Sequence, residues 1–321
     1  MHLRFRGKAL TLRVEEEGHP RPDPQPDVIE VRVDDAPARR VTLVPGMHEL
    51  VLAQGLRATE HRLTVTKLTE GEAGTLRVQG LRLDDGGAIL DPAPPPPRRM
   101  LVVGDSISAG YGVRGSDSTC RAVSAMCDAS MAWPSLAAEA LPAALHLVAW
   151  SGRGLTRNYD PTQVETLPDL ATRTLPTQAR PPWRGAAWPP TDILIAVGAN
   201  DVARPGFDDA AYGRALFTLI ARTQEPATAA NVLVVVGPML FDDAPYPGAD
   251  SHRRVLAATR RVVEERRRAG FARTAWIDLA PAPPDEGLGC EQHPSARSHR
   301  RMAAEVVARL RTAPFVDPTA P

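Results

Sequence analysis

The chain has 321 residues, of which 43% are hydrophobic, and its 38 Lys and Arg residues balance 38 Asp and Glu residues. A chain without net basic charge has no field that would hold a polyanion, so we expect no nucleic-acid partner. No apolar run approaches the ~20 residues that a membrane-spanning helix requires, so we expect a soluble protein without membrane insertion. At ~150 residues per domain, this length predicts about two domains.

The first 90 residues alternate apolar and polar side chains. The alternation begins in residues 1–14, which lack the continuous apolar core of a signal peptide, so the chain as written is expected in the cytoplasm. Turn residues separate further alternating runs at 28–33, 40–44, 49–52, 61–68 and 75–83. Period-two runs with no helical stretch between them predict an antiparallel β-sandwich over residues 1–90.

A proline-rich segment, residues 91–98, follows with the sequence DPAPPPPR. Consecutive prolines favour a stiff polyproline II conformation and cannot join a helix or a central strand. One interpretation is a ligand for a polyproline-binding module. We favour a short linker, because a spacer between two strand-rich segments needs no partner.

Continuous apolar runs replace the alternation after the linker. They occupy 100–103, 145–149, 193–197, 232–236 and 275–279, and helical patterns lie at 133–140, 210–222, 253–268 and 295–311. Strands buried by helices on both faces show such runs, so residues 99–312 are predicted to form a three-layer α/β domain with a parallel sheet. Residues 313–321 form a C-terminal tail. The active site of such a domain lies beyond the carboxyl ends of the strands.

Ser106 is the candidate nucleophile. It follows the first apolar run in the sequence VGDSI, in a turn of small residues before a short helical pattern. Its amide would lie near a helix N-terminus at the sheet edge, where oxyanions are stabilised. The alternative is that Ser106 only caps that helix. The GxSxG elbow of the α/β-hydrolases is absent.

Three further segments are predicted at the same edge. Gly152 follows the second apolar run, and Asn200 and Asp201 follow the third. Glycine offers an unhindered backbone amide and Asn200 an NH2 group that suits a developing oxyanion, whereas Asp201 is expected to brace its loop. His293 precedes the last helical pattern and is the candidate general base, because imidazole titrates near neutrality. Each residue alone has a purely structural interpretation, but their shared position favours one site.

Four blocks in this order resemble those of the SGNH, or GDSL-type, hydrolases: GDSI at 104–107, the glycine block at 152, GAND at 198–201 and HP at 293–294. The resemblance spans residues 99–312. It implies a flavodoxin-like fold and an esterase with a serine nucleophile, without a metal or organic cofactor.

A narrower resemblance covers almost the whole chain. The β-sandwich, the linker, GYG at 110–112, WSGRG at 150–154, RNY at 157–159, VGPM at 236–239 and the GC and HP pairs at 289–294 look like carbohydrate esterase family 2. Those enzymes pair a jelly-roll-like domain with an SGNH domain and remove O-acetyl groups from sugars, xylan and mannan units among them. The resemblance implies that Ser106 is the nucleophile and His293 the base. It also implies an oxyanion hole of the Ser106 N–H, the Gly152 N–H and the Asn200 side chain.

The sequence departs from the superfamily just before His293. Cys290 stands where the superfamily has an aspartate, but Glu291 matches an acid that family 2 members often carry. We therefore assign Glu291 as the third catalytic residue, with its side chain folded back toward Nδ1 of His293 and backbone carbonyls sharing that work, and expect Glu291→Gln to lower kcat about ten- to a hundredfold. Cys290→Ser is expected to cost less, unless Cys290 is bridged to Cys120 or Cys127. The alternative is a Ser-His dyad without an acid, which some family members resemble.

The candidate sugar-binding residues are Tyr111, Trp183, Trp188 and Gln292. Gln292 stands where relatives commonly have an aromatic that packs against sugar. The two tryptophans lie in the proline-rich stretch 181–190, where they either rim the cleft or pack the loop. Three cysteines allow at most one disulfide, and no second ligand pair accompanies Cys290 and His293, so no metal is expected.

We interpret the sequence as a two-domain serine esterase that deacetylates carbohydrate through an acyl-enzyme intermediate. One alternative is a short-chain lipid or general esterase on the same scaffold. Another is a carbohydrate-binding protein whose hydrolase domain has lost catalysis, against which the intact Ser106, Gly152, Asn200 and His293 argue. Relatives in the family are usually exported, whereas this chain shows no signal.

Overall fold

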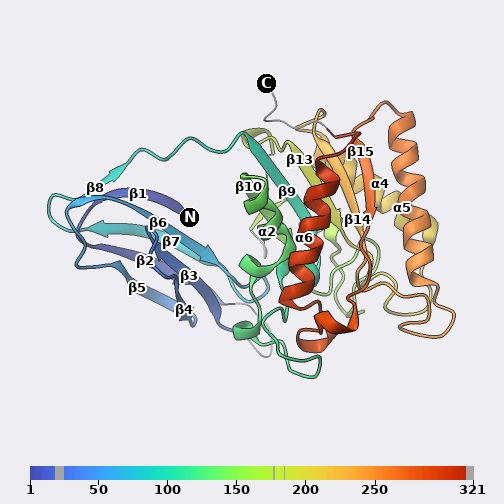
Figure 1. The fold of residues 1–321 in the computed structure, drawn as a ribbon, viewed down its shortest axis with the longest axis horizontal. Coiled ribbons are helices and arrows are strands. Elements are labelled where there is room, and N and C mark those ends of the chain that lie inside the picture. The colour runs from blue at the N-terminus through green and yellow to red at the C-terminus, as the bar shows by residue number, and fades with distance from the viewer. Residues whose placement is uncertain (19–24, 176–177, 184, 316–321) are drawn as a thin grey trace.

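The computed structural model describes residues 1–18, 25–175, 178–183 and 185–315. Figure 1 shows two bodies: the strands of the first 90 residues lie on one side, and the helices and strands of the rest lie on the other. An extended segment connects β8 (Ala88–Leu90) to β9 (Arg98–Gly104). β9 therefore begins at the last residue that we assigned to the linker.

The first body consists of two antiparallel sheets, with strand orders β4-β3-β6-β1-β8 and β5-β2-β7. The bounds of the strands are β1 (His2–Gly7), β2 (Leu10–Glu16), β3 (Asp27–Val33), β4 (Arg39–Leu43), β5 (Gly46–Ala53), β6 (Thr59–Lys67) and β7 (Leu76–Leu83). Residues of both sheets join one hydrophobic cluster. The predicted β-sandwich is thereby confirmed.

Alternation along the strands explains this packing. On β2, Leu10, Leu12 and Val14 are buried, whereas Arg13 between them is exposed. The three apolar side chains pack in the same cluster as the fully buried Leu63 of the opposite sheet. Because successive side chains of a strand point to opposite faces, a period-two pattern puts the apolar ones into the core.

The second body is built on one parallel sheet of order β10-β9-β13-β14-β15. The other strands are β10 (Ala143–Ala149), β13 (Asp192–Ala196), β14 (Asn231–Val236) and β15 (Thr274–Asp278). All five strands coincide with predicted apolar runs. Counted within this sheet, the spatial order is 2-1-3-4-5, which is the flavodoxin-like order. The predicted fold class is confirmed.

Helices cover both faces of this sheet (Figure 1). They are α2 (Trp133–Ala140) and α6 (Ala296–Leu310) on one face, and α4 (Asp209–Gln224) and α5 (Ser251–Arg268) on the other. On β9, Met100 and Val102 join the cluster of α2 and α6, whereas Leu101 and Val103 join the cluster of α4 and α5. Within the described ranges, no helix is both long and apolar enough to cross a bilayer.

Short elements fill the connections. They are α1 (Ser106–Ala109), α3 (Leu167–Leu170), β11 (Arg173–Leu175), β12 (Gln178–Pro182), and the 3-10 turns η1 (Ser124–Met126), η2 (Ala129–Met131), η3 (Gly185–Ala187), η4 (Pro284–Glu286) and η5 (Cys290–Gln292). The antiparallel hairpin of β11 and β12 was not predicted, because its strands are too short to show an alternating pattern.

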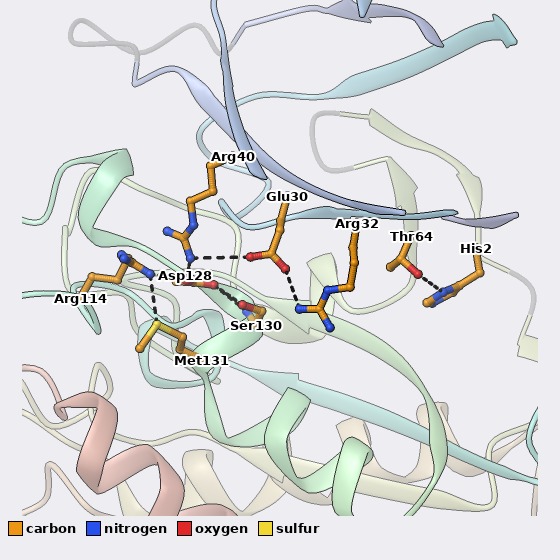
Figure 2. A network of polar contacts seen from close by, with 9 residues as sticks. All are labelled: His2, Glu30, Arg32, Arg40, Thr64, Arg114, Asp128, Ser130 and Met131. Carbon is orange, nitrogen blue, oxygen red and sulfur yellow. Dashed lines mark hydrogen bonds and ion pairs between the residues drawn. The ribbon is translucent and has the colours of Figure 1, made fainter. Parts of the chain in front are cut away.

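The β-sandwich packs against the 114–131 segment of the second body, as Figure 2 shows. Arg40 of β4 makes an ion pair with the buried carboxylate of Asp128. The same carboxylate accepts a hydrogen bond from Nη1 of Arg114 at 3.2 Å. Charged contacts between the bodies therefore add to the covalent linker in fixing the sandwich beside the second body.

Candidate active site

Strand register brings three loops to one level of the sheet. Gly104, the last residue of β9, pairs with Ala149 of β10 on one side and with Ala196 of β13 on the other. The loops that carry Ser106, Gly152 and Asn200 leave the sheet from these three neighbouring strand ends. This edge is also where the order of the strands reverses, which is the usual ligand-binding position of such a sheet.

Ser106 and His293 form a hydrogen-bonded pair across 187 positions of sequence, with Oγ and Nε2 2.8 Å apart. Ser106 is the first residue of α1, and Asp105 caps this helix by accepting a hydrogen bond from the Ile107 amide at 3.0 Å. Nδ1 of His293 lies 3.0 Å from the backbone carbonyl of Glu291, which only accepts. Nδ1 therefore carries the proton, and Nε2 accepts from the Ser106 hydroxyl.

The carboxylate of Glu291 does not occupy the predicted place. It accepts a hydrogen bond from the Tyr111 hydroxyl at 2.8 Å and from the Ala122 amide at 3.2 Å. Glu291 has a positive φ of 51°, and in this turn its carbonyl, and not its side chain, is the partner of His293 Nδ1. The expectation that the side chain folds back onto Nδ1 is therefore wrong, because the backbone takes this position.

A disulfide between Cys120 and Cys290 ties the turn that precedes His293 to the 112–120 segment. The Cys290 amide also donates to the Gly112 carbonyl at 3.0 Å, and the Glu291 amide donates to the Cys120 carbonyl at 3.1 Å. The sequence allowed one bridge without identifying its pair. This disulfide therefore fixes the position of Cys290 and of the turn that leads to His293.

Tyr111 contacts both His293 and the side chain of Glu291. Its ring lies 4.7 Å from the imidazole of His293, centroid to centroid, and its hydroxyl bonds to Glu291. Burial and the bond to Glu291 raise the pKa of Tyr111, so the group stays a neutral phenol. The structure thus places Tyr111 beside the Ser106–His293 pair, and the sugar contact that we assigned to Tyr111 stays a prediction.

Burial lowers the pKa of His293, although the carbonyl of Glu291 acts in the opposite direction. The imidazole is therefore neutral at physiological pH, as a general base must be. Burial also raises the pKa of the Asp105 carboxyl to about 7. The hydrogen bond from the Ile107 amide opposes that shift.

The loop that carries Gly152 is held in a fixed conformation. Gly152 has a φ of 74°, a left-handed conformation that favours glycine. Nδ2 of Asn200 donates to the Arg153 carbonyl at 2.9 Å. The carboxylate of Asp201 accepts from the backbone amides of Leu155 at 2.9 Å and Thr156 at 2.8 Å. Asp201 was expected to brace its own loop, and the structure shows that it braces the neighbouring Gly152 loop.

A cavity of about 400 Å³ adjoins the catalytic pair. Gln292 and Pro294, the two neighbours of His293, line its wall. Phe241 and Leu288 also line it, and their side chains are 46% and 39% exposed. Sequence reasoning identified Gln292 but missed Phe241, although its position after β14 puts it at the same edge of the sheet.

Trp183 and Trp188 lie elsewhere. Both rings pack edge-on against His146 of β10, at centroid distances of 4.7 and 5.7 Å. His146 lies three residues before the end of β10, about 10 Å from the edge that carries Ser106. Both tryptophans pack against the hydrophobic core, so of the two interpretations loop packing describes them.

Two family models match the chain. The GDSL-like lipase/acylhydrolase family matches residues 102–301, and the carbohydrate esterase 2 N-terminal model matches residues 1–95. The first body therefore matches a model specific to carbohydrate esterase family 2, and the second body confirms the broader resemblance to the GDSL-type hydrolases.

Characterised relatives cover both bodies. A cellulase/esterase, CelE, from Acetivibrio thermocellus is 29% identical over 81% of this chain, which spans only 31% of that relative. An acetylxylan esterase/glucomannan deacetylase from Cellvibrio japonicus is 29% identical over 88% of this chain and 75% of its own length. A solved family two carbohydrate esterase from Clostridium thermocellum, in complex with cellohexaose, has the same fold, with a TM-score of 0.87 and 24% identity over 96% of this chain and 90% of its own.

Proposed function

The chain belongs to the GDSL-like lipase/acylhydrolase family, and on that basis we propose that it is a serine esterase that removes O-acetyl groups from carbohydrate. The observation that carries the proposal is the hydrogen bond of 2.8 Å between the Ser106 hydroxyl and a neutral His293. The proposal includes the division into a β-sandwich at 1–90, a linker at 91–98 and a hydrolase domain at 99–312.

In the proposed reaction, Oγ of Ser106 attacks the acetyl carbonyl while Nε2 of His293 takes the hydroxyl proton. The carbonyl of Glu291 keeps Nδ1 protonated and stabilises the imidazolium that forms. His293 then gives the proton to the leaving sugar oxygen, which leaves an acetyl-enzyme. Water, deprotonated by His293, attacks this intermediate and releases acetate.

The oxyanion of each tetrahedral intermediate needs donors that are already in place. The backbone amides of Ser106 and Gly152 and the side-chain amide of Asn200 leave neighbouring strand ends, which supports this role. One hydrogen of the Asn200 NH2 is used to bond the Arg153 carbonyl, and this bond orients the second hydrogen.

The cavity beside His293 supports a sugar substrate. The exposed ring of Phe241 and the apolar side chain of Leu288 offer surface for the hydrophobic face of a pyranose, and Gln292 offers a polar contact. The relatives from Cellvibrio japonicus are named acetylxylan esterase/glucomannan deacetylase, which points to acetylated xylan and glucomannan. We therefore propose xylan- or mannan-type chains as the substrate class.

The direct test is acetate release, followed by NMR, from acetylated xylo- and manno-oligosaccharides. Release of acetate from at least one of these two classes of oligosaccharide would support the proposal. Sugar binding without any acetate release would instead favour a non-catalytic carbohydrate-binding protein.

We expect kcat/KM for nitrophenyl acetate to exceed that for nitrophenyl octanoate at least about tenfold, a difference of ~1.4 kcal/mol. The reason is that the first body matches the carbohydrate esterase 2 N-terminal model and that 88% of the chain aligns with an acetylxylan esterase/glucomannan deacetylase. Initial rates with the two esters at equal low concentration measure this ratio. Faster turnover of the octanoyl ester would favour the lipid esterase.

The pH dependence follows from the environment of His293. Only the neutral imidazole can accept the Ser106 proton, and burial lowers its pKa below the ordinary 6.5. The base thus stays active as the pH falls below 6.5, and activity is lost only as the pH passes through the lowered pKa. We expect the acid limb of the kcat/KM profile to have its midpoint below pH 6.5. A midpoint above that value would contradict the buried, neutral base.

A further inference from the structure

We propose that the β-sandwich contributes a positioning residue to the active site: Glu70 holds the Gly152 loop in the conformation that presents its amide to the oxyanion. Glu70 lies in the 68–74 loop, which connects β6 to β7. The inference rests on the proposed function, since it concerns the oxyanion hole of that reaction.

The contact itself is direct. Oε2 of Glu70 accepts a hydrogen bond from the backbone amide of Ser151 at 2.7 Å, although the two residues are 81 positions apart and belong to different bodies. The amide of Trp150 donates to the Gly104 carbonyl at 3.1 Å. The two peptide groups that lead into Gly152 are thus fixed, one by the sheet and one by Glu70.

The same loop reaches the other side of Gly152. Glu72, which is 4% exposed, makes an ion pair with Arg153, at 3.4 Å between Oε1 and Nη2. The carbonyl of Arg153 is in turn the acceptor for Asn200. Two carboxylates of the sandwich therefore contact both neighbours of Gly152. One of these neighbours, Arg153, also bonds Asn200, another predicted oxyanion donor.

Hydrogen bonds and burial hold the 68–74 loop in place. Nζ of Lys67 donates to the backbone carbonyls of Thr69 at 3.0 Å and Glu70 at 2.8 Å. Leu68 is fully buried, and its carbonyl accepts from the Ala129 amide at 2.9 Å. A loop held at its base by such bonds can fix the residue that it presents.

A carboxylate beside an oxyanion hole disfavours the negative charge that develops there. Its presence at this place therefore needs another explanation. Because the bond goes to the amide of Ser151, the purpose that the geometry supports is orientation of the adjacent peptide. Orientation needs an acceptor oxygen at this place and does not need the negative charge. This distinction makes the role of Glu70 testable with a conservative variant.

The test compares Glu70→Ala, Glu70→Asp and Glu70→Gln in the full chain. Ala removes the acceptor and Asp shortens its reach, so both are expected to lower kcat about ten- to a hundredfold with KM changed less than about threefold. Gln keeps an acceptor oxygen and is expected to retain kcat within about threefold. Thermal unfolding confirms that each variant is folded, and the Asp variant serves if Ala prevents folding.

Arg40→Ala is the matched control. Arg40 contributes to the same interface through Asp128, and among the described residues it makes no hydrogen bond or ion pair with the Gly152 loop. Asp128 keeps its contact with Arg114 in this variant (Figure 2). We expect kcat of this variant within about threefold of the parent. An equal loss in Arg40→Ala and Glu70→Ala would mean that docking of the sandwich matters and not Glu70, and would overturn the inference.

A boronic acid supplies a second readout, because it forms a tetrahedral adduct on the serine hydroxyl and so occupies the oxyanion hole. The affinity of phenylboronic acid is expected to fall in Glu70→Ala in parallel with kcat and to recover in Glu70→Gln. Unchanged boronate affinity in Glu70→Ala, or a Gln variant as impaired as Ala, would refute the positioning role. If hydrolysis by the parent enzyme did not depend on Ser106, the proposed function itself would fail. That result can be told apart from the two outcomes that refute the positioning role of Glu70.

Discussion

Ser106→Ala is expected to lower kcat for acetyl ester hydrolysis by at least about a thousandfold. The substitution removes Oγ, the hydrogen-bond partner of His293 Nε2, so no acetyl-enzyme can form and water must attack the bound ester unaided. Binding and the oxyanion donors remain, which is why a small residual rate is expected. Hydrolysis of nitrophenyl acetate and acetate release from an acetylated oligosaccharide both measure the loss.

The fold should survive this substitution, because Ser106 begins α1 and alanine is favourable in a helix. Ser108→Ala is a matched control on the same helix: its Oγ is buried and, within the described part of the chain, makes no hydrogen bond. We expect the control to keep kcat within about threefold. If the Ser106→Ala variant retained more than about a thousandth of the parent rate, the assignment of Ser106 as the nucleophile would be wrong.

The sequence predicted the architecture because its patterns are strong and local. Alternation at Leu10, Leu12 and Val14 predicts a strand with one apolar face, which packs into a core. The continuous apolar run at 100–103 predicts a strand that is buried on both faces. Once five parallel strands were predicted, the carboxyl edge of the sheet followed, and with it the common position of Ser106, Gly152 and Asn200.

The remaining features depend on tertiary geometry. No periodicity predicts that Glu291 adopts a positive φ and turns its carbonyl toward His293, since that conformation is rare outside glycine. Three cysteines permit three pairings, and only the fold places Cys120 against Cys290. The contact of Glu70 with Ser151 joins different bodies, and its position is set by how the sandwich docks.

Removal of the Cys120–Cys290 disulfide is expected to affect stability most. The bridge closes a loop of 170 positions, and the chain-entropy model gives ~5 kcal/mol for a loop of this length. The Cys120→Ser/Cys290→Ser double variant should therefore unfold about 10 °C or more below the parent. Calorimetry of both proteins, with and without dithiothreitol, measures the difference.

The same variant should lose about tenfold in kcat, because the bridge anchors the turn that carries His293. Glu291→Gln should cost less than about threefold, since the Glu291 carbonyl that bonds Nδ1 is retained. A glutamine oxygen can also accept from the Tyr111 hydroxyl. The sequence predicted the opposite order unless Cys290 was bridged to Cys120 or Cys127. The structure shows this bridge, and the backbone carbonyl of Glu291, not its carboxylate, is the partner of His293 Nδ1.

Cys127→Ser is the matched control for the double variant. Cys127 is the free cysteine of the described chain, and burial raises the pKa of its thiol to about 12, so it is a poor nucleophile for disulfide exchange. It should match the parent in kcat and in its sensitivity to reductant, whereas reduced parent protein should match the double variant. If the double variant kept the parent's unfolding temperature, or if Glu291→Gln were the more impaired enzyme, the disulfide would not be what holds the base, and the Glu291 side chain would regain its predicted role.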